Sequence, residues 1–91
     1  MKPKFSLGQL VATPGALQAL EEAGQNAAFF LEKHGAADWG EVNDEDKHLN
    51  DEALVNGERL LSAYRTLKGV KIWIITEADR SSTCCLLPSE Y

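Results

Sequence analysis

The sequence predicts a single α+β domain over residues 1–91, in which two to three N-terminal helices pack on an antiparallel sheet of three or four strands. Two observations carry this prediction. Capping signals for helices occur in the first sixty residues, and strand patterns that form a C-terminal meander follow them. The run Lys71–Thr76 is apolar on both faces, too apolar for an edge strand, so we expect it at the centre of the sheet.

The segment before Thr13 alternates weakly between apolar and polar residues and is interrupted by Gly8. We expect a short edge strand there, over residues 6–12. Thr13 followed by Pro14 is typical of a helix start, because threonine caps the first turn and proline suits the first helical position. The first helix is therefore predicted to begin at Pro14 and to end at Gly24.

A second helix is predicted over residues 27–33, with Asn26 as its cap and Gly35 as its end. It is apolar around much of its circumference, so we expect it between the first helix and the sheet. The glycine-flanked loop that follows contains Trp39. A tryptophan in such a loop more often fills the edge of the core than stacks on a ligand.

A third helix is predicted from the cap Asn43 to about Val55, ending at Gly57. Three acidic residues follow the cap, where the helix dipole favours negative charge. The apolar content of this helix is low, so we expect it on the surface with one narrow stripe turned inward. Its acidic residues, between Glu41 and Glu52, are interpreted as a solvated helix start, with an acidic docking face as the alternative.

Three strands are predicted after the helices, over residues 59–66, 71–77 and 82–87. Residues 67–70 supply the turn of a hairpin, and Pro88 ends the last strand. We expect the order of these strands in space to follow their order in the sequence.

The two faces of the central strand are both apolar. Val70, Ile72 and Ile74 share one face, and Trp73 and Ile75 share the other. One face should contact the helices. The other requires cover from a terminal segment, a loop or a second copy of the protein.

The composition favours a protein partner or a small ligand. Net charge is −5, from 14 acidic residues against 9 lysines and arginines, and no basic run occurs. Broad electrostatic binding of nucleic acid is disfavoured, because it needs a basic surface. No apolar run approaches the roughly 20 residues that span a bilayer. No signal peptide is visible, so we expect a cytoplasmic protein without membrane attachment.

The adjacent cysteines, Cys84 and Cys85, are interpreted as free thiols that serve as small apolar side chains on a strand. Neighbouring strand residues point to opposite faces, which makes a disulfide between them strained. His34 and His48 have no zinc-like spacing with them. We predict no metal site and no cofactor.

One set of residues suggests an enzymatic mechanism. Helices followed by an antiparallel meander is also the order of elements in barnase-like and RelE-like endoribonucleases. If the protein is an enzyme, Glu77 could act as general base, His34 as general acid, and Arg80 or Arg65 could stabilise a pentavalent phosphate. The acidic charge of the chain and the position of His34 at a helix end argue against this.

The charged corner after the central strand has two interpretations. In the simpler one, Asp79 bonds its own backbone in a tight turn, and Glu77 or Asp79 pairs with Arg80 at the surface. In the other, this corner binds a ligand against an aromatic wall. The binding candidates are therefore Trp39, Tyr64, Trp73, Glu77, Asp79 and Arg80.

With these segments assigned, most of the chain resembles a family of small uncharacterised bacterial proteins described as plasmid-related. The resemblance implies a bacterial origin and a mobile-element context, and it brings no established activity. The segments that carry it are Phe5–Leu17, His34-Gly35, Asp38–Gly40, Leu61–Tyr64, Trp73–Ser81, Leu86–Pro88 and Tyr91.

The functional hypothesis from the sequence is a non-enzymatic interaction protein that acts through a protein partner or through self-association. Its basis is the negative charge, the lack of a catalytic motif and the excess of apolar side chains on the central strand. Two alternatives stay open: the endoribonuclease, and an acidic decoy that blocks a nucleic-acid-binding enzyme.

Overall fold

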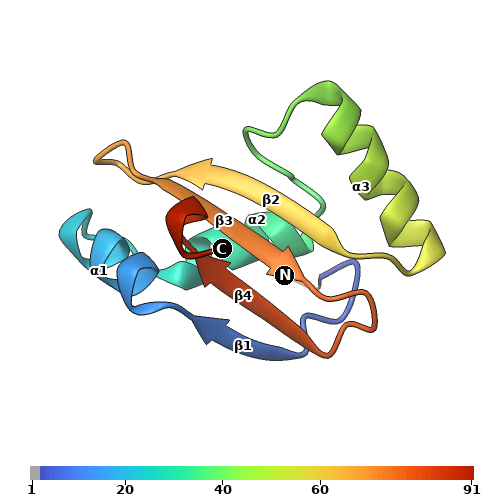
Figure 1. Ribbon diagram of the computed structural model, residues 1–91, viewed down its shortest axis with the longest axis horizontal. Helices are drawn as coiled ribbons and strands as arrows, with labels where there is room; N and C mark the ends of the chain where they lie inside the picture. Colours follow the sequence, from blue (N-terminus) through green and yellow to red (C-terminus); the bar gives the residue numbers. More distant parts are fainter. Residues whose placement is uncertain (1–2) are drawn as a thin grey trace.

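In the computed structural model of the protein, residues 3–91 are described, and they form an α+β fold with a four-stranded sheet (Figure 1). Helices dominate the N-terminal part, and strands the C-terminal part, as predicted. The elements in chain order are β1 (Gln9–Ala12), α1 (Pro14–Glu22), α2 (Ala27–Gly35), α3 (Asp44–Asn56), β2 (Leu60–Arg65), β3 (Lys71–Thr76), β4 (Ser82–Leu86) and the short 3₁₀ helix η1 (Pro88–Glu90).

The three α-helices begin at the predicted caps. The side chains of Thr13, Asn26 and Asn43 each accept a hydrogen bond from the backbone N–H three residues further on, which satisfies a donor without an intrahelical partner. Helix α3 ends at Gly57, which has the left-handed conformation (φ 73°) that glycine adopts readily. Helix α2 extends to Gly35, beyond its predicted last residue Lys33.

The strand order is β1-β4-β3-β2, which confirms β3 as a central strand of the meander β2-β3-β4. The prediction of a wholly antiparallel sheet was wrong at one pair. Strand β1 runs parallel to β4, with Gln9 beside Ser82 and Ala12 beside Cys85. Each meander strand reverses through a short turn. Between β1 and the meander lie three helices, so no turn fixes the direction of β1.

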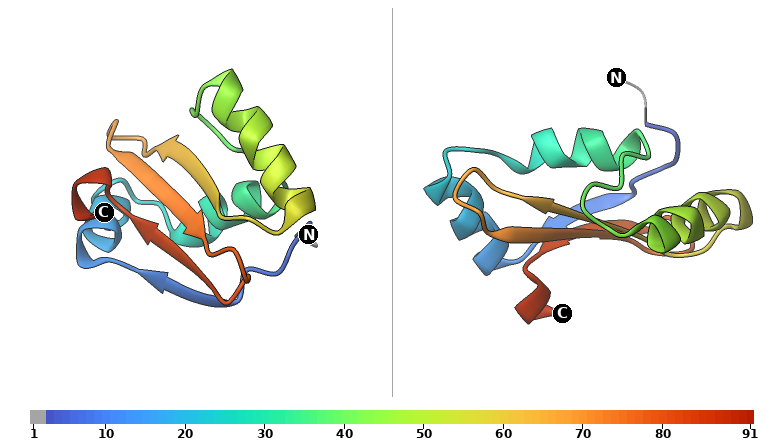
Figure 2. Two further views of the ribbon diagram at one scale, coloured as in Figure 1. Left: turned by 45° about the vertical axis from the view of Figure 1, so that its right-hand side comes forward. Right: turned by 90° about the horizontal axis from the view of Figure 1, so that it is seen from above.

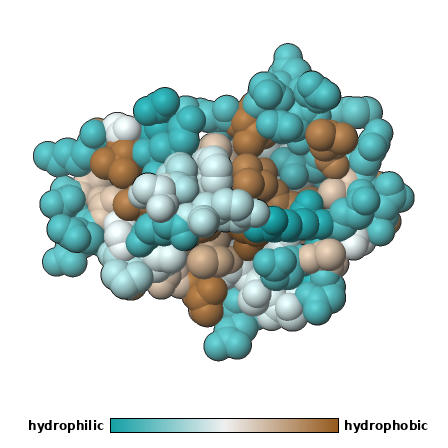
Figure 3. Space-filling model, in the orientation of Figure 1, coloured by the Kyte–Doolittle hydropathy of each residue, from teal (hydrophilic) through white to brown (hydrophobic). Residues whose placement is uncertain are grey.

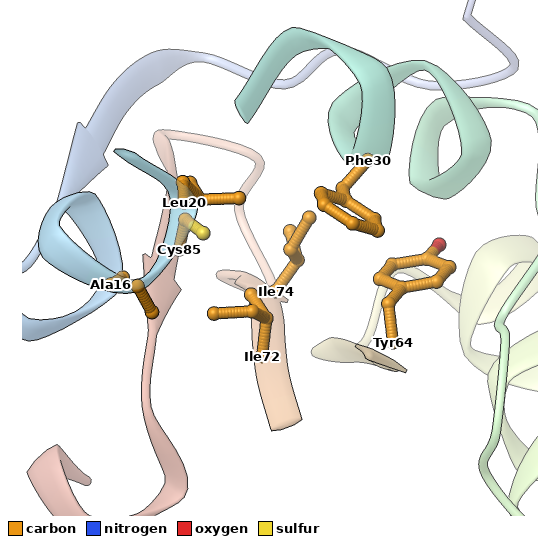
Figure 4. Close-up of a cluster of buried hydrophobic side chains, with 8 residues drawn as sticks. Ala16, Leu20, Phe30, Tyr64, Ile72, Ile74 and Cys85 are labelled. Carbon is orange, nitrogen blue, oxygen red and sulfur yellow. The ribbon is translucent and has the colours of Figure 1, made fainter. Parts of the chain in front are cut away.

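One face of the sheet packs against α1 and α2 and forms the main core (Figure 4). On this face the side chains of Ile72 and Ile74 from β3 lie between Leu20 of α1 and Phe30 of α2. Both isoleucines are completely buried. The core cluster consists of Ala16, Ala19, Leu20, Phe30, Tyr64, Ile72, Ile74 and Cys85.

The opposite face of β3 is covered in part by the C-terminal segment. Figure 2 places η1 on the side of the sheet away from α2. The ring of Tyr91 packs edge-on against Trp73, with 5.8 Å between ring centroids. Ile75 and Leu86 on this face are buried, at 4% and 6% exposed. The sequence offered a terminal segment, a loop or a second copy as cover for this face of β3, and the structure shows the terminal segment.

Helix α2 lies on the sheet with its outer side open to solvent (Figure 2), not between α1 and the sheet as predicted. Phe30 and His34 point inward and are buried, whereas Ala28, Phe29 and Glu32 are exposed. The apolar residues of α2 therefore do not all contribute to the core, and the exposed side chain of Phe29 misled the sequence interpretation.

Candidate functional site

Arg80, a candidate for both catalysis and binding, is used to hold the fold together. Its guanidinium donates hydrogen bonds to the carbonyls of Glu58 (2.6 Å), Glu77 (3.0 Å) and Ala53 (3.2 Å). It also lies over the ring of Phe5, 5.6 Å from the centroid. The cation thus joins the β3–β4 corner to the C-terminal end of α3, where the helix dipole favours positive charge.

The other residues of the corner form a tight turn. The Asp79 carboxylate accepts a hydrogen bond from the Ser81 N–H (2.9 Å), and bonds from Ser81 hold the pKa of Asp79 below its ordinary value. Within residues 3–91, Arg80 forms no salt bridge with Glu77 or Asp79. The predicted turn is therefore present, and the predicted ion pair is replaced by bonds to carbonyl groups.

His34 lies in a buried chain of hydrogen bonds that connects α2 to three strands and to the N-terminal segment. Its Nδ1 is 2.5 Å from the hydroxyl of Ser62, and its Nε2 is 2.8 Å from that of Thr76. Thr76 in turn contacts Thr83 (2.7 Å), and the Thr83 hydroxyl donates to the carbonyl of Leu7 (2.7 Å). The histidine, the serine and both threonines have no exposed surface.

The positions of the protons in this series of hydrogen bonds follow from counting the donors. Because Thr83 donates its single proton to Leu7, it must accept from Thr76, and Thr76 must then accept from Nε2–H of His34. A neutral imidazole protonated at Nε2 accepts at Nδ1, so Ser62 donates there. Burial and the positive charge of Arg80 lower the pKa of His34 to about 4, which keeps the ring neutral at pH 7.

The three residues proposed for an enzyme do not form one site. Both ring nitrogens of His34 are occupied by Ser62 and Thr76, and the ring is buried. The guanidinium of Arg80 bonds carbonyl groups, whereas Glu77 is exposed. Among residues 3–91, no hydrogen bond joins His34 to Glu77 or Arg80. This arrangement offers a substrate no general acid at His34, and it commits both terminal nitrogens of Arg80 to carbonyl groups.

The aromatic candidates lie in three separate places. Trp39 is buried against Phe5 and His34, and its indole N–H donates to Asp51 (3.0 Å), so it fills the edge of the core as predicted. Tyr64 is buried in the main core, and its hydroxyl donates to the carbonyl of Asp38. Trp73 lies on the other face of the sheet beneath Tyr91. They do not form a common aromatic wall.

Both cysteines are free, and they lie on opposite faces of β4 as expected for neighbouring strand residues. Cys85 belongs to the main core, and burial raises the pKa of its thiol to about 11. Burial and the nearby Glu90 and Glu77 also raise the pKa of Cys84. Over residues 3–91, no three histidine, cysteine or acidic side chains are placed to hold a metal ion.

One edge of the sheet, formed by β2, is blocked by the chain itself. The side-chain amide of Asn50 on α3 donates to the carbonyl of Leu61 (2.8 Å) and accepts from its N–H (3.1 Å), as a neighbouring strand would. Two residues further along, Ala63 bonds to Trp39 and Glu41. The outward-facing backbone groups of Leu61 and Ala63 are thus occupied, which protects this part of the edge from pairing with another chain.

Glycine allows the close approach that blocks this edge. Gly40 has φ 74°, and a Cβ atom built on it would lie 2.0 Å from the carbonyl oxygen of Ala63. The segment from Trp39 to Glu41 can therefore lie against β2 only with glycine at its centre.

No other segment of residues 3–91 covers the opposite edge of the sheet, which β1 forms (Figure 1). The N–H of Gln9 donates to the carbonyl of Ser81, just before β4, and the N–H of Thr13 donates to the carbonyl of Cys85 in β4, at 3.0 Å each. Alternate residues of a parallel strand bond the same neighbour, so the backbone groups of Leu10 and Ala12 face away from β4. Leu10 is 53% exposed and Val11 44% exposed. Within the described part of the chain, this edge presents backbone groups without partners together with apolar side chains.

An apolar hollow of about 180 Å³ lies beside this open edge, on the side of the sheet that carries α2. One wall comes from the N-terminal segment and β1, and the other from α2. The first wall consists of Pro3, Leu7 and Leu10, and the second of Ala28, Leu31, Glu32 and Gly35. The hydrogen-bond chain through His34 connects the two walls, because it begins on α2 and ends at Leu7.

The exposed face of the sheet is a weaker candidate for a docking surface. Figure 3 shows this face, and its apolar side chains form separate patches with hydrophilic side chains between them. Contiguous apolar surface is what marks an interaction site. The open edge and its hollow are therefore the strongest candidate site.

The edge strand predicted before Thr13 is confirmed as β1, but sequence reasoning missed the hollow beside it and the role of Asn50. A signal for Asn50 was present in its position on α3. It lies three residues before Ala53, on the inward stripe of the helix, and both residues are buried.

No protein family, no curated protein and no solved structure matches this chain. None of the helices in residues 3–91 is both long and apolar enough to cross a membrane.

Proposed function

We propose that the protein is an interaction module that binds an extended segment of a partner protein at β1. The segment adds a strand to the open edge and places an apolar side chain in the hollow beside α2. Main-chain hydrogen bonds supply part of the affinity in this mode of recognition, and pockets for alternate side chains supply specificity.

The observation that carries the proposal is the difference between the two sheet edges. The chain blocks β2 with Asn50 and the segment at Gly40, whereas the outward backbone groups of Leu10 and Ala12 on β1 have no partner among residues 3–91. Native proteins usually cover, shorten or charge such edges, and β1, although only four residues long, has no charged side chain. An edge that is left open next to an apolar hollow is the arrangement that a strand-adding partner requires.

The geometry of an added strand fits the hollow. Side chains of a strand alternate between the two faces of a sheet, so every second residue of the added segment points to the side of α2. The hollow opens on that side, between Leu10 and Leu31. The contact is small, because β1 has four residues, so we expect a transient complex with a Kd of about 10–100 μM.

A partner protein is favoured over a second copy of the chain. Two copies each carry a net charge of −5 and repel each other, whereas a basic partner is attracted. The same charge disfavours nucleic acid. The resemblance to plasmid-related bacterial proteins supports a setting in the bacterial cytoplasm.

The test is selection of binding peptides from a displayed random library, followed by NMR titration of the labelled protein with the selected peptides. We expect the amide signals of residues 8–12 and 28–35 to shift. The variant Leu10→Pro should abolish these shifts, because it removes an N–H that faces outward and leaves the bonds to β4 intact.

The control variant Val55→Ser alters an 85% exposed residue on α3 and should bind like the wild type. The proposal is wrong if no peptide is selected, if the shifts map to another surface, or if folded Leu10→Pro binds unchanged. Concentration-dependent sedimentation that Leu10→Pro abolishes would show that a second copy occupies the edge, and it would also overturn the proposal.

A further inference from the structure

The hollow has the size of one apolar side chain. Its volume of about 180 Å³ is close to the roughly 150 Å³ of an engineered apolar cavity that holds one benzene molecule. A leucine or phenylalanine side chain fills such a space, whereas alanine leaves most of it empty. The hollow therefore selects for a single large apolar residue in the added segment.

Glu32 is the one charged residue among those that line the hollow. It lies on the exposed side of α2, and it takes part in no salt bridge among residues 3–91. The charge in the lining of the hollow is thus negative, as is the net charge of the chain. Complementarity favours a basic residue beside the apolar one.

The distance between the two recognised residues follows from strand geometry. Residues that share one face of a strand are two positions apart, or roughly 6.6 Å. A lysine or arginine at that distance from the residue in the hollow has a side chain long enough to reach the Glu32 carboxylate at its rim. The structure does not favour either strand direction, so the basic residue stands either before or after the apolar one.

We propose, on the basis of the function proposed above, that the partner segment has a leucine or phenylalanine and, two positions away, a lysine or arginine. The apolar side chain occupies the hollow between β1 and α2, and the basic side chain pairs with Glu32. The occupant is a basic extended segment of another protein.

The experiment uses blocked synthetic peptides of about ten residues, with threonine at the other strand positions for their high strand propensity. Two parent peptides have a central phenylalanine and a lysine two positions before or after it. Replacing the phenylalanine with alanine should weaken binding at least about tenfold, because a large apolar side chain is no longer buried. Replacing the lysine with threonine should weaken binding about two- to fivefold, with a loss that shrinks at high salt.

Variants of the protein assign these effects to the hollow. Glu32→Gln should remove the preference for lysine, and the matched change Glu21→Gln on α1 should leave it unchanged. Ala28→Leu places extra side-chain volume in the hollow from an exposed helix position, so it should remove the preference for phenylalanine without loss of folding.

The results separate this inference from the function on which it rests. If peptides shift the amides of residues 8–12 but bind equally well with alanine or threonine at the tested positions, the edge binds segments and the inferred specificity is wrong. If no parent peptide binds while library-selected peptides of another pattern do, the specificity is likewise wrong. If no peptide of either origin perturbs β1, both proposals fall.

Discussion

Acid should destabilise the protein through His34. The ring is fully buried and neutral, and its pKa is lowered from 6.5 to about 4 in the folded state. Below pH 6.5 the unfolded chain binds a proton at this residue and the folded protein does not. The free energy of unfolding is therefore unaffected by this residue well above pH 6.5, and it decreases as the pH falls toward 4.

The size of the effect follows from the two pKa values. One unit of difference corresponds to 1.36 kcal/mol, so the total loss is about 3 kcal/mol, of which about 2 kcal/mol is lost between pH 7 and pH 5. A domain of this size has a free energy of unfolding of roughly 5–10 kcal/mol. Proton uptake by one imidazole in the unfolded chain can thus remove a large share of the stability in acid.

Urea unfolding at a series of pH values measures this dependence. The variant His34→Gln should abolish the slope between pH 6.5 and pH 5, because glutamine donates and accepts hydrogen bonds without titrating. The matched variant His48→Gln changes an exposed histidine and should retain the slope. NMR of the wild type gives an independent reading, since the native His34 ring should not titrate above pH 5. A slope between pH 6.5 and pH 5 that survives in His34→Gln, or a native ring that titrates near pH 6.5, would refute the reasoning.

Two further predictions concern the contacts around α3, and both are measured as free energies of unfolding. Asn50→Ala should lower the free energy of unfolding by about 1–3 kcal/mol, because it leaves the backbone N–H and C=O of Leu61 without partners. The control Leu49→Ala, on the exposed side of the same helix, should change it by less than about 0.5 kcal/mol. Equal effects of the two changes would contradict the edge-capping role. Arg80→Lys should lower the free energy of unfolding by about 2 kcal/mol, because an ammonium group cannot reach the carbonyls of Ala53, Glu58 and Glu77 together. No change in stability would contradict the structural role of Arg80 and would favour a role in binding.

The local parts of the fold were predictable from the sequence. Caps such as Thr13 and Asn43 act through the backbone of the next few residues, so a short window contains all the information. The run at Lys71–Thr76 was read correctly as a central strand because its composition alone excludes an edge.

The remaining features depend on contacts between distant residues. The direction of β1 is set by its pairing with β4, and the bonds of Arg80 depend on where α3 ends. His34 was considered as a catalytic acid because histidine titrates near neutral pH, but its partners Ser62 and Thr76 lie 28 and 42 positions away along the chain. No local pattern indicates that such a residue is buried and neutral.

The parallel pair β1–β4 has a consequence for the order of folding. It joins the two ends of the described chain: Thr83 bonds Leu7 across 76 positions, and Thr13 bonds Glu90 across 77. Closing so long a loop costs conformational entropy before any contact compensates for it, whereas the two hairpins of the meander close over a few residues. During synthesis on the ribosome, β1 must wait until β4 has been made. The strand with the open edge is thus also the last to dock, and until then the growing chain exposes both sides of it to chaperones and to neighbouring polypeptides.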